Sequence, residues 1–441
     1  MSVLKKIAAT CAALLLAASV QAQKTPNYPI ERYTLDNGLR VIFSEDHSLP
    51  LVAVAVGYDV GSRNEVKGKT GFAHLFEHLM FQGSAHMKKG EFFKKIADAG
   101  GDVNGRTMDE CTIYHEVVPT EKLPMMLWAE ADRMRSLAVN IDNLNNQKDV
   151  VKEEKRMNWD NNPYSLAHLK IQEISYTNFS NAHSTIGSMD DLDAAPLDYV
   201  KLFFKTYYVP NNAALVLTGD FSPKVARPLI QKLFGTIPRG AAPPKNDITE
   251  TKQPKMRKVT LEFPNVSTPA MYMTWPIPSA GSPELPALIV LNEMLFSGKE
   301  NRAGSDIGAG EHFAGFGGDI EPQRGPTMFE VQTRFRPDIE PDKLIDQMYV
   351  QIFRIQSEAP EKAEMERAKA NYLAGEYTRD IEPLLERVLV ITRHTLTNDK
   401  PEDTFTMYSK VLAVTPEQVQ AVAKKYLLRD TMSLVIVKPK G

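Results

Sequence analysis

Three polar side chains, His74, Glu77 and His78, interrupt the otherwise apolar run of residues 71–81. If this run is helical, each residue advances by about 100°, so the three side chains leave from one side and the histidines lie one turn apart. Two imidazoles at positions i and i+4 can share one zinc ion. A neighbouring carboxylate that is not a ligand can take a proton from metal-bound water. The pattern is that of an inverted zincin motif.

A structural role for these histidines is the competing interpretation. The chain has only 9 histidines in 441 residues, and His-x-x-Glu-His is expected by chance roughly 0.02 times in such a chain. Two imidazoles and a carboxylate on an apolar helix are costly to bury without a partner such as a metal. A third ligand is needed to decide between the two interpretations.

The segment from residue 143 to 160 offers Glu154 as that third ligand. On a helical wheel its side chain falls inside the apolar stripe of the segment, formed by Val150, Val151 and Met157. A carboxylate that points toward the core needs a cation or strong donors, and a salt bridge is the alternative to a metal. Two histidines, one carboxylate and an open position for water form a standard catalytic zinc set. We therefore expect one zinc ion per chain.

The elements that must position these residues are short strands and helices. Asp36-Asn-Gly38 predicts a tight hairpin turn. Residues 102–111 read as a polar turn, and turn and sheet chemistry is the competing role for Asn104 and Thr107 within this region. Strands are predicted over 32–35, 39–43, 51–60, 112–118 and 213–219, and helices over 89–99, 121–137 and 223–234.

The second half of the chain repeats the first. Residues 77–83 align with residues 292–298 at an offset of 215, and this copy has Ile289, Asn292 and Glu293 in place of His74, Glu77 and His78, respectively. The second copy therefore keeps the fold but cannot bind this zinc. We predict an N-terminal domain over 23–238, a Pro/Gly-rich linker over 239–246 and a C-terminal domain over 247–441.

The N-terminus has the pattern of a removable secretory signal peptide, residues 1–22. Lys5 and Lys6 precede an apolar run of 14 residues, 7–20, and small residues follow before an expected cleavage point after Ala22. The run is too short for a membrane span, and a retained anchor is the alternative. We therefore expect export to a periplasm, with no membrane span in the mature chain. The net charge of −3, with no basic surplus, gives no indication of nucleic-acid binding.

Taken together, these motifs resemble the pitrilysin/insulinase superfamily of zinc metallopeptidases, especially bacterial relatives of mitochondrial processing peptidase. The resemblance is carried by the lead-in 61–74, the segment 104–114, the helix 149–156 with Asn162-Pro-Tyr164, and His183 with Ile186-Gly187. It covers most of residues 30–440. Two positions depart from the family pattern: Gly105 stands where alanine is common, and Gln147 stands where several members have a glutamate that supports the metal.

The resemblance implies an α+β fold of two homologous domains, each with a mainly antiparallel sheet against helices, that form half of a clamshell. It implies a zinc endopeptidase for peptides or short unfolded polypeptides, with His74, His78 and Glu154 as ligands and Glu77 as the base. Substrate would add as a strand beside Asn104 and Thr107.

The same resemblance implies a dimer that encloses a chamber. In one subunit type of the family an arginine and a tyrosine of the C-terminal domain approach the substrate. Arg302 is the candidate arginine, with surface charge as the alternative, and residues 297–319 read as Gly-rich and irregular with no tyrosine. The chain could thus form a homodimer, or a heterodimer with a related subunit that lacks zinc ligands. The competing function is a non-catalytic peptide-binding or assembly subunit.

Overall fold

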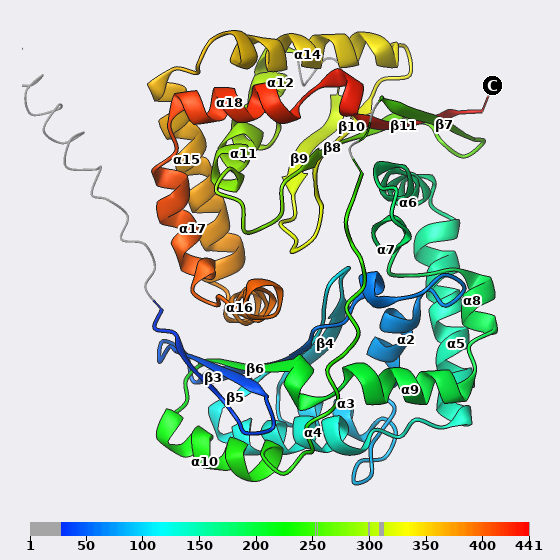
Figure 1. Cartoon of the computed structure of the whole chain (residues 1–441), viewed down its shortest axis with the longest axis vertical. Coiled ribbons are helices and arrows are strands. Elements are labelled where there is room, and N and C mark those ends of the chain that lie inside the picture. Colours follow the sequence, from blue (N-terminus) through cyan, green and yellow to red (C-terminus); the bar gives the residue numbers. More distant parts are fainter. Residues whose placement is uncertain (1–27, 252, 254, 299, 308–312, 441) are drawn as a thin grey trace, which may run out of the picture.

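The structure is a computed structural model that describes residues 28–251, 253, 255–298, 300–307 and 313–440. The predicted signal peptide lies outside the described residues. Two sheets are each packed against helices (Figure 1). This arrangement confirms the predicted fold class, two mainly antiparallel sheets in an α+β chain.

The first sheet has six strands in the order β1-β2-β6-β3-β5-β4. The neighbours β2 and β6 are parallel, and the other pairs are antiparallel. The central strands are buried on both faces, which accounts for their nearly continuous apolar sequence. The strands are β1 (Glu31–Thr34), β2 (Arg40–Glu45), β3 (Leu51–Tyr58), β4 (Asp102–Thr107), β5 (Thr112–Pro119) and β6 (Ala213–Gly219).

The second sheet repeats five of these strands in the same spatial order. Its order is β7-β11-β8-β10-β9, with β7 and β11 parallel and the other pairs antiparallel. This order matches β2-β6-β3-β5-β4, so the internal repeat extends to the topology. The strands are β7 (Arg257–Phe263), β8 (Ala270–Ile277), β9 (Phe313–Ile320), β10 (Thr327–Phe335) and β11 (Ser433–Pro439).

The helices of the first part of the chain include the predicted metal-binding helix, α2. They are α2 (Phe72–Leu79), α3 (Glu91–Asp98), α4 (Leu123–Ser136), α5 (Ile141–Lys155), α6 (Pro163–Ser175), α7 (Phe179–Ala182), α8 (Met189–Asp193), α9 (Leu197–Tyr207) and α10 (Pro223–Phe234). Those of the second part are α11 (Leu285–Asn292), α12 (Arg302–Asp306), α14 (Pro341–Ser357), α15 (Lys362–Glu376), α16 (Leu384–Asn398), α17 (Asp403–Leu412) and α18 (Pro416–Tyr426).

Two sequence-based expectations were wrong. The polar segment that begins at Asp102 is not only a turn, because its first six residues form β4 at the edge of the sheet. Polar side chains are tolerated there because every second residue of β4 is exposed. The stretch 297–319 is not irregular throughout either, since it includes α12 and most of β9.

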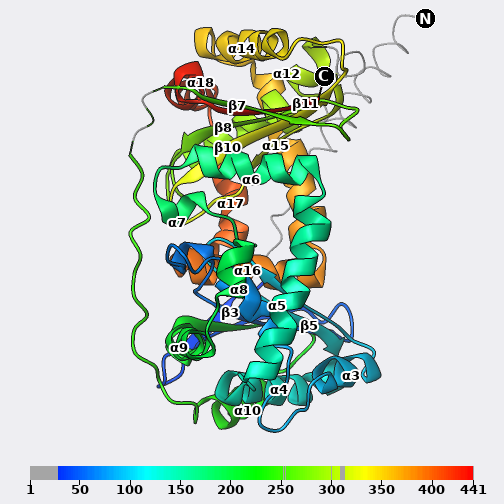
Figure 2. The same ribbon diagram turned by 90° about the vertical axis from the view of Figure 1, so that its right-hand side faces the viewer.

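The two halves exchange helices across their boundary. Helix α16 of the second half packs on β3 and β6 of the first sheet, with Val388 and Ile391 in one buried cluster with Ala55. Reciprocally, α6 of the first half packs on β8 and β11, where Ile171 shares a buried cluster with Val435. Figures 1 and 2 show both helices between the two sheets. Each sheet thus needs the other half of the chain to cover one of its faces.

The connection between the halves is extended. Residues 239–246, the predicted linker, contain no helix or strand, and the segment between α10 and β7 runs along one side of the molecule (Figure 2). The predicted domain limits stay a prediction. Dividing the chain at this segment would separate α6 from the second sheet and α16 from the first sheet, although each helix packs on that sheet. Of the helices described, none is both long and apolar enough to cross a bilayer.

The helix exchange predicts that a mutation in the second half destabilises the first sheet. Ile391 on α16 is fully buried, so Ile391→Ala should lower the free energy of unfolding by about 2–5 kcal/mol. Amide hydrogen exchange measured by mass spectrometry should increase in β3 and β6. The matched control is Ile352→Ala, because Ile352 is equally buried but lies in the core of the second sheet. If both variants gave the same exchange pattern, the coupling through α16 would be refuted.

Candidate metal centre

Helix α2 presents its polar residues on one side because its apolar residues are packed on the other. Phe72, Leu75, Phe76 and Leu79 are all buried in the main core cluster of the first half. The helix begins after Gly71, whose φ of 82° lies in the left-handed region that favours glycine. The predicted helix over this run is therefore present, and the polar side chains leave from the side that faces α5 and β4.

The structure brings His74, His78 and Glu154 together. Nε2 of His74 and Nε2 of His78 are 3.3 Å apart. Oε2 of Glu154 lies 3.7 Å from the first nitrogen and 3.3 Å from the second. Four tetrahedral ligands at 2.0–2.1 Å from zinc are about 3.3 Å from one another. The three donor atoms therefore have the spacing that one zinc ion requires.

The surroundings also favour the protonation states that a metal needs. Burial, with the nearby His78 adding to it, lowers the pKa of His74 to about 4, so this imidazole is neutral at pH 7. The hydrogen bond with His78 lowers the pKa of the Glu154 carboxyl despite partial burial. Neutral imidazoles and an ionised carboxylate are the forms that bind zinc. Within the described residues, Nδ1 of His74 is buried without a hydrogen-bond partner, so the polar contacts of this ring are those of Nε2 with His78 and Glu154.

The carboxylate of Glu77 points to β4. The hydroxyl of Thr107 donates a hydrogen bond of 2.5 Å to its Oε2. Burial raises the pKa of the Glu77 carboxyl, and the Thr107 hydrogen bond opposes this effect. A Cβ at Gly105 would lie 2.7 Å from Cγ of Glu77. The glycine that departs from the family pattern thus lets β4 lie directly against this glutamate.

The structure separates the three residues predicted to bind substrate. Thr107 contacts Glu77, whereas Asn104 is exposed on the opposite face of β4 and accepts a hydrogen bond from the backbone of Gly105. Arg302 lies on α12, beside α14 and far from α2 in Figure 1. Its guanidinium makes a bidentate ion pair with Glu364, at 2.7 and 2.8 Å. Arg302 and the metal centre are therefore not brought together within one chain.

The wheel argument for Glu154 was only partly correct. Of the predicted apolar stripe, Val151 is buried, but Val150 and Met157 are 43% and 66% exposed. Glu154 faces α2 at a half-buried position instead of pointing into the core. The helix ends in a π-helical turn, residues 156–160, so its last residues depart from the regular 100° spacing.

Gln147, two turns before Glu154, is buried and donates a hydrogen bond to Asn146.

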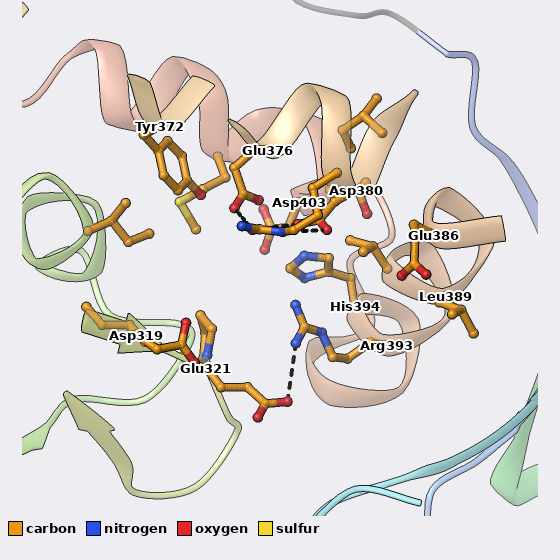
Figure 3. A pocket seen from close by; sticks show the side chains of 18 of the residues that line it. Asp319, Glu321, Tyr372, Glu376, Asp380, Glu386, Leu389, Arg393, His394 and Asp403 are labelled. Carbon is orange, nitrogen blue, oxygen red and sulfur yellow. Dashed lines mark hydrogen bonds and ion pairs between the residues drawn. The ribbon is translucent and has the colours of Figure 1, made fainter. Parts of the chain in front are cut away.

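A cavity of about 650 Å³ begins beside Thr107 and extends to the second half. Its wall includes the C-terminal ends of β4 and β9 and residues of α15, α16 and α17. Charges in this wall pair with one another: Arg379 forms ion pairs with Glu376 and Asp380, and Arg393 lies 3.5 Å from Glu321. Figure 3 shows Glu376, Asp380, Arg393 and Glu321 in this wall. A smaller cavity, about 290 Å³, also borders Thr107 and includes Trp159 and His168. Both cavities adjoin the strand that contacts Glu77.

Comparisons with known proteins agree with this site. The family model "Insulinase (Peptidase family M16)" matches residues 40–188, which include all three candidate ligands, and the model "Peptidase M16 inactive domain" matches residues 195–372. The zinc protease PqqE of Helicobacter pylori is 28% identical over 365 residues, which are 81% of this chain and 82% of that protein. A probable mitochondrial-processing peptidase subunit beta of Arabidopsis thaliana is 22% identical over 434 residues, 92% of this chain and 78% of that protein.

The fold is also found among solved structures. The crystal structure of a protease from Helicobacter pylori superposes with a TM-score of 0.88 and 25% identity, covering 93% of this chain and all of that chain. Together with the family models and the relatives above, this similarity confirms the predicted resemblance.

The geometry predicts that Glu154 is required for metal binding. Glu154→Gln should weaken zinc binding more than about 100-fold, because loss even of groups that only orient a ligand typically costs 10–100-fold. The measurement is zinc affinity by competition with a chromophoric chelator. Glu153→Gln is the matched control, since this neighbouring carboxylate is exposed and pairs with Arg156. Equal zinc affinity of Glu154→Gln and the control would contradict the assignment.

Proposed function

This chain belongs to the insulinase family, peptidase family M16, and from that premise we propose that it is a zinc-dependent endopeptidase. It would hydrolyse peptides or short unfolded polypeptides. The observation that carries the proposal is the set of three donor atoms at tetrahedral spacing, with the carboxylate of Glu77 on the same side of α2. A purely structural pair of histidines does not need a carboxylate from a second helix at this spacing.

The proposed chemistry divides between the metal and Glu77. Zinc bound by His74, His78 and Glu154 would supply a polarised water whose pKa is lowered toward neutrality. Glu77 is not one of the three ligands, so its carboxylate can accept a proton from this water and later donate it to the nitrogen of the leaving amine. Burial raises its pKa, and a value closer to neutrality favours both transfers.

The edge of the first sheet is the proposed binding site for the peptide backbone. Among the described strands, β4 pairs only with β5, so one side of its backbone can pair with an added strand. Pairing through the main chain tolerates many sequences. The cavity beside Thr107 has the size of a pocket for a small ligand or a few residues, and it cannot hold a folded domain. The proposed substrates are therefore peptides and unfolded segments.

The assembly and location of the enzyme remain part of the proposal. The signal pattern supports export to a periplasm, with domains over 23–238 and 247–441 joined by the linker 239–246. A dimer would enclose the chamber. Arg302 is already paired with Glu364, which supports the hypothesis that a partner subunit supplies the groups that approach substrate. The chain purified alone would then be a weak peptidase, and full activity of a homodimer would refute the heterodimer.

The proposal predicts that Glu77→Gln removes activity but not metal. Loss of a general base typically lowers kcat by about 10²–10⁴-fold, whereas the three ligands are unchanged. Zinc content by atomic emission and hydrolysis of a quenched fluorescent peptide give the two readouts. A wild-type chain that holds zinc but is no more active than Glu77→Gln would favour the non-catalytic peptide-binding or assembly subunit.

The two faces of β4 predict different kinetic effects. Thr107→Val removes the hydrogen bond to Glu77 and should lower kcat about 10-fold with little change in KM, because a bond to a charged group contributes about 1.5–3 kcal/mol. Thr107→Ser should restore the rate. Asn104→Ala, on the exposed face, should instead raise KM. Unchanged kcat/KM for Asn104→Ala on several peptides would remove Asn104 from the substrate site.

A further inference from the structure

The loop before α2 contains a fully buried carboxylate, Glu65. One of its oxygens accepts a hydrogen bond from the backbone N–H of Gly71 at 2.9 Å, and the other accepts from that of Ala73 at 2.8 Å. Nε2 of His183 lies 3.0 Å from the first oxygen. An ionised carboxylate is costly to bury unless such donors surround it. These three partners therefore hold the Glu65 carboxylate in one position.

Glu65 takes the role of a helix cap for α2. Gly71 occupies the capping position but has no side chain to accept the free N–H groups of the first turn. A carboxylate at this end satisfies two of them and interacts favourably with the positive end of the helix dipole. Because α2 has only eight residues, the position of its first turn depends strongly on this contact. His74 directly follows the capped residue Ala73.

His183 is the side-chain partner of Glu65. Its Nδ1 lies 2.7 Å from the carbonyl oxygen of Phe179, which can only accept a hydrogen bond, and its Nε2 faces the carboxylate. Both ring nitrogens therefore face acceptors, which favours the doubly protonated, cationic ring. The ring stacks on that of Phe179, with centroids 4.4 Å apart. The imidazole is thus oriented from two sides.

A second set of contacts holds the same loop against residues 187–191. The backbone N–H and the hydroxyl of Thr70 both donate to Oδ2 of Asp191, at 2.9 and 2.5 Å. Gly187 approaches Gly71 so closely that a Cβ at residue 187 would lie 2.3 Å from its nitrogen. The start of α2 is therefore held between its own loop and a segment more than 100 residues later.

We propose that Glu65, paired with His183, positions the first turn of α2 and thereby sets the place of the His74 imidazole in the metal centre. The inference rests on the proposed metal centre. Neither residue contacts a ligand side chain, so both are positioning residues that act through the backbone of α2. Metal sites are sensitive to ligand displacements well below 1 Å. Loss of the contacts between Glu65, His183 and the first turn of α2 should therefore weaken metal binding before it unfolds the chain.

The test compares metal binding by the full chain and its variants. Glu65→Gln removes the charge and places an amide N–H₂ group against backbone N–H donors. His183→Phe keeps a ring that can stack on Phe179 but removes the donor to Glu65. Glu65→Asp keeps the charge on a shorter side chain. The matched control is Thr415→Ala, which removes the capping box of α18 in the second half and so destabilises a helix remote from the metal centre.

The readouts are zinc affinity by chelator competition and the visible absorption spectrum of the cobalt(II)-substituted chain. We expect zinc affinity about 10–100-fold weaker for Glu65→Gln, a smaller loss for His183→Phe, and partial recovery in Glu65→Asp. The cobalt spectrum should change in Glu65→Gln and not in Thr415→Ala. If Glu65→Gln does not fold, His183→Phe provides the same comparison.

Wild-type zinc affinity and cobalt spectra in Glu65→Gln, or in His183→Phe where that variant decides, would overturn the inference. Equal losses in Thr415→Ala would also overturn it, because general destabilisation would then explain the effect. The proposed function can fail separately. A wild-type chain that binds zinc without hydrolysing peptides would refute the peptidase and leave the affinity comparison intact, whereas a chain that binds no zinc would refute both.

Discussion

The candidate metal centre depends on the packing of α2 against α5, because its donor atoms come from both helices. Leu144 and Val151 of α5 are buried in the same core cluster as Leu75 of α2, so apolar contacts decide how close Glu154 comes to the imidazoles. The resulting burial lowers the pKa of His74 to about 4 and keeps its ring neutral. The apolar contact between these helices thus determines the spacing of the donor atoms and contributes to the neutral state of the His74 ring.

The second half shows which parts of this arrangement serve the fold and which serve the chemistry. Asn292, at the position of Glu77, donates to the backbone oxygen of Gly318 in β9, much as Glu77 accepts from Thr107 in β4. Glycine lies against the helix in both halves: a Cβ at Gly105 would clash with Glu77, and a Cβ at Gly318 would clash with Asn292. The link between helix and edge strand is therefore structural and is present in both copies.

Only the first copy combines that link with metal donors. Ile289 and Glu293 stand where the first half has histidines, and a cavity borders both. Nearby, Arg379 forms ion pairs with Glu376 and Asp380, so these two carboxylates are compensated by a guanidinium. This difference agrees with the match of the second half to the inactive domain of the family.

The exchange of α6 and α16 keeps β4 and β9 on the same cavity, because each sheet is covered by a helix of the other half.

The sequence by itself determined the local part of the site. A helical period places His74, Glu77 and His78 on one side, and the repeat at an offset of 215 predicted a second copy without ligands. Glu154 was identified from the sequence, but two of the three apolar residues used to place it, Val150 and Met157, have exposed side chains. The edge strand β4, the bond from Thr107 to Glu77 and the Glu65–His183 pair were not predicted. A glutamate shortly before a helix that begins with an uncapped glycine was the available signal for Glu65. Tertiary structure decided these contacts, because residues 30 to 118 positions apart meet only when separate elements pack.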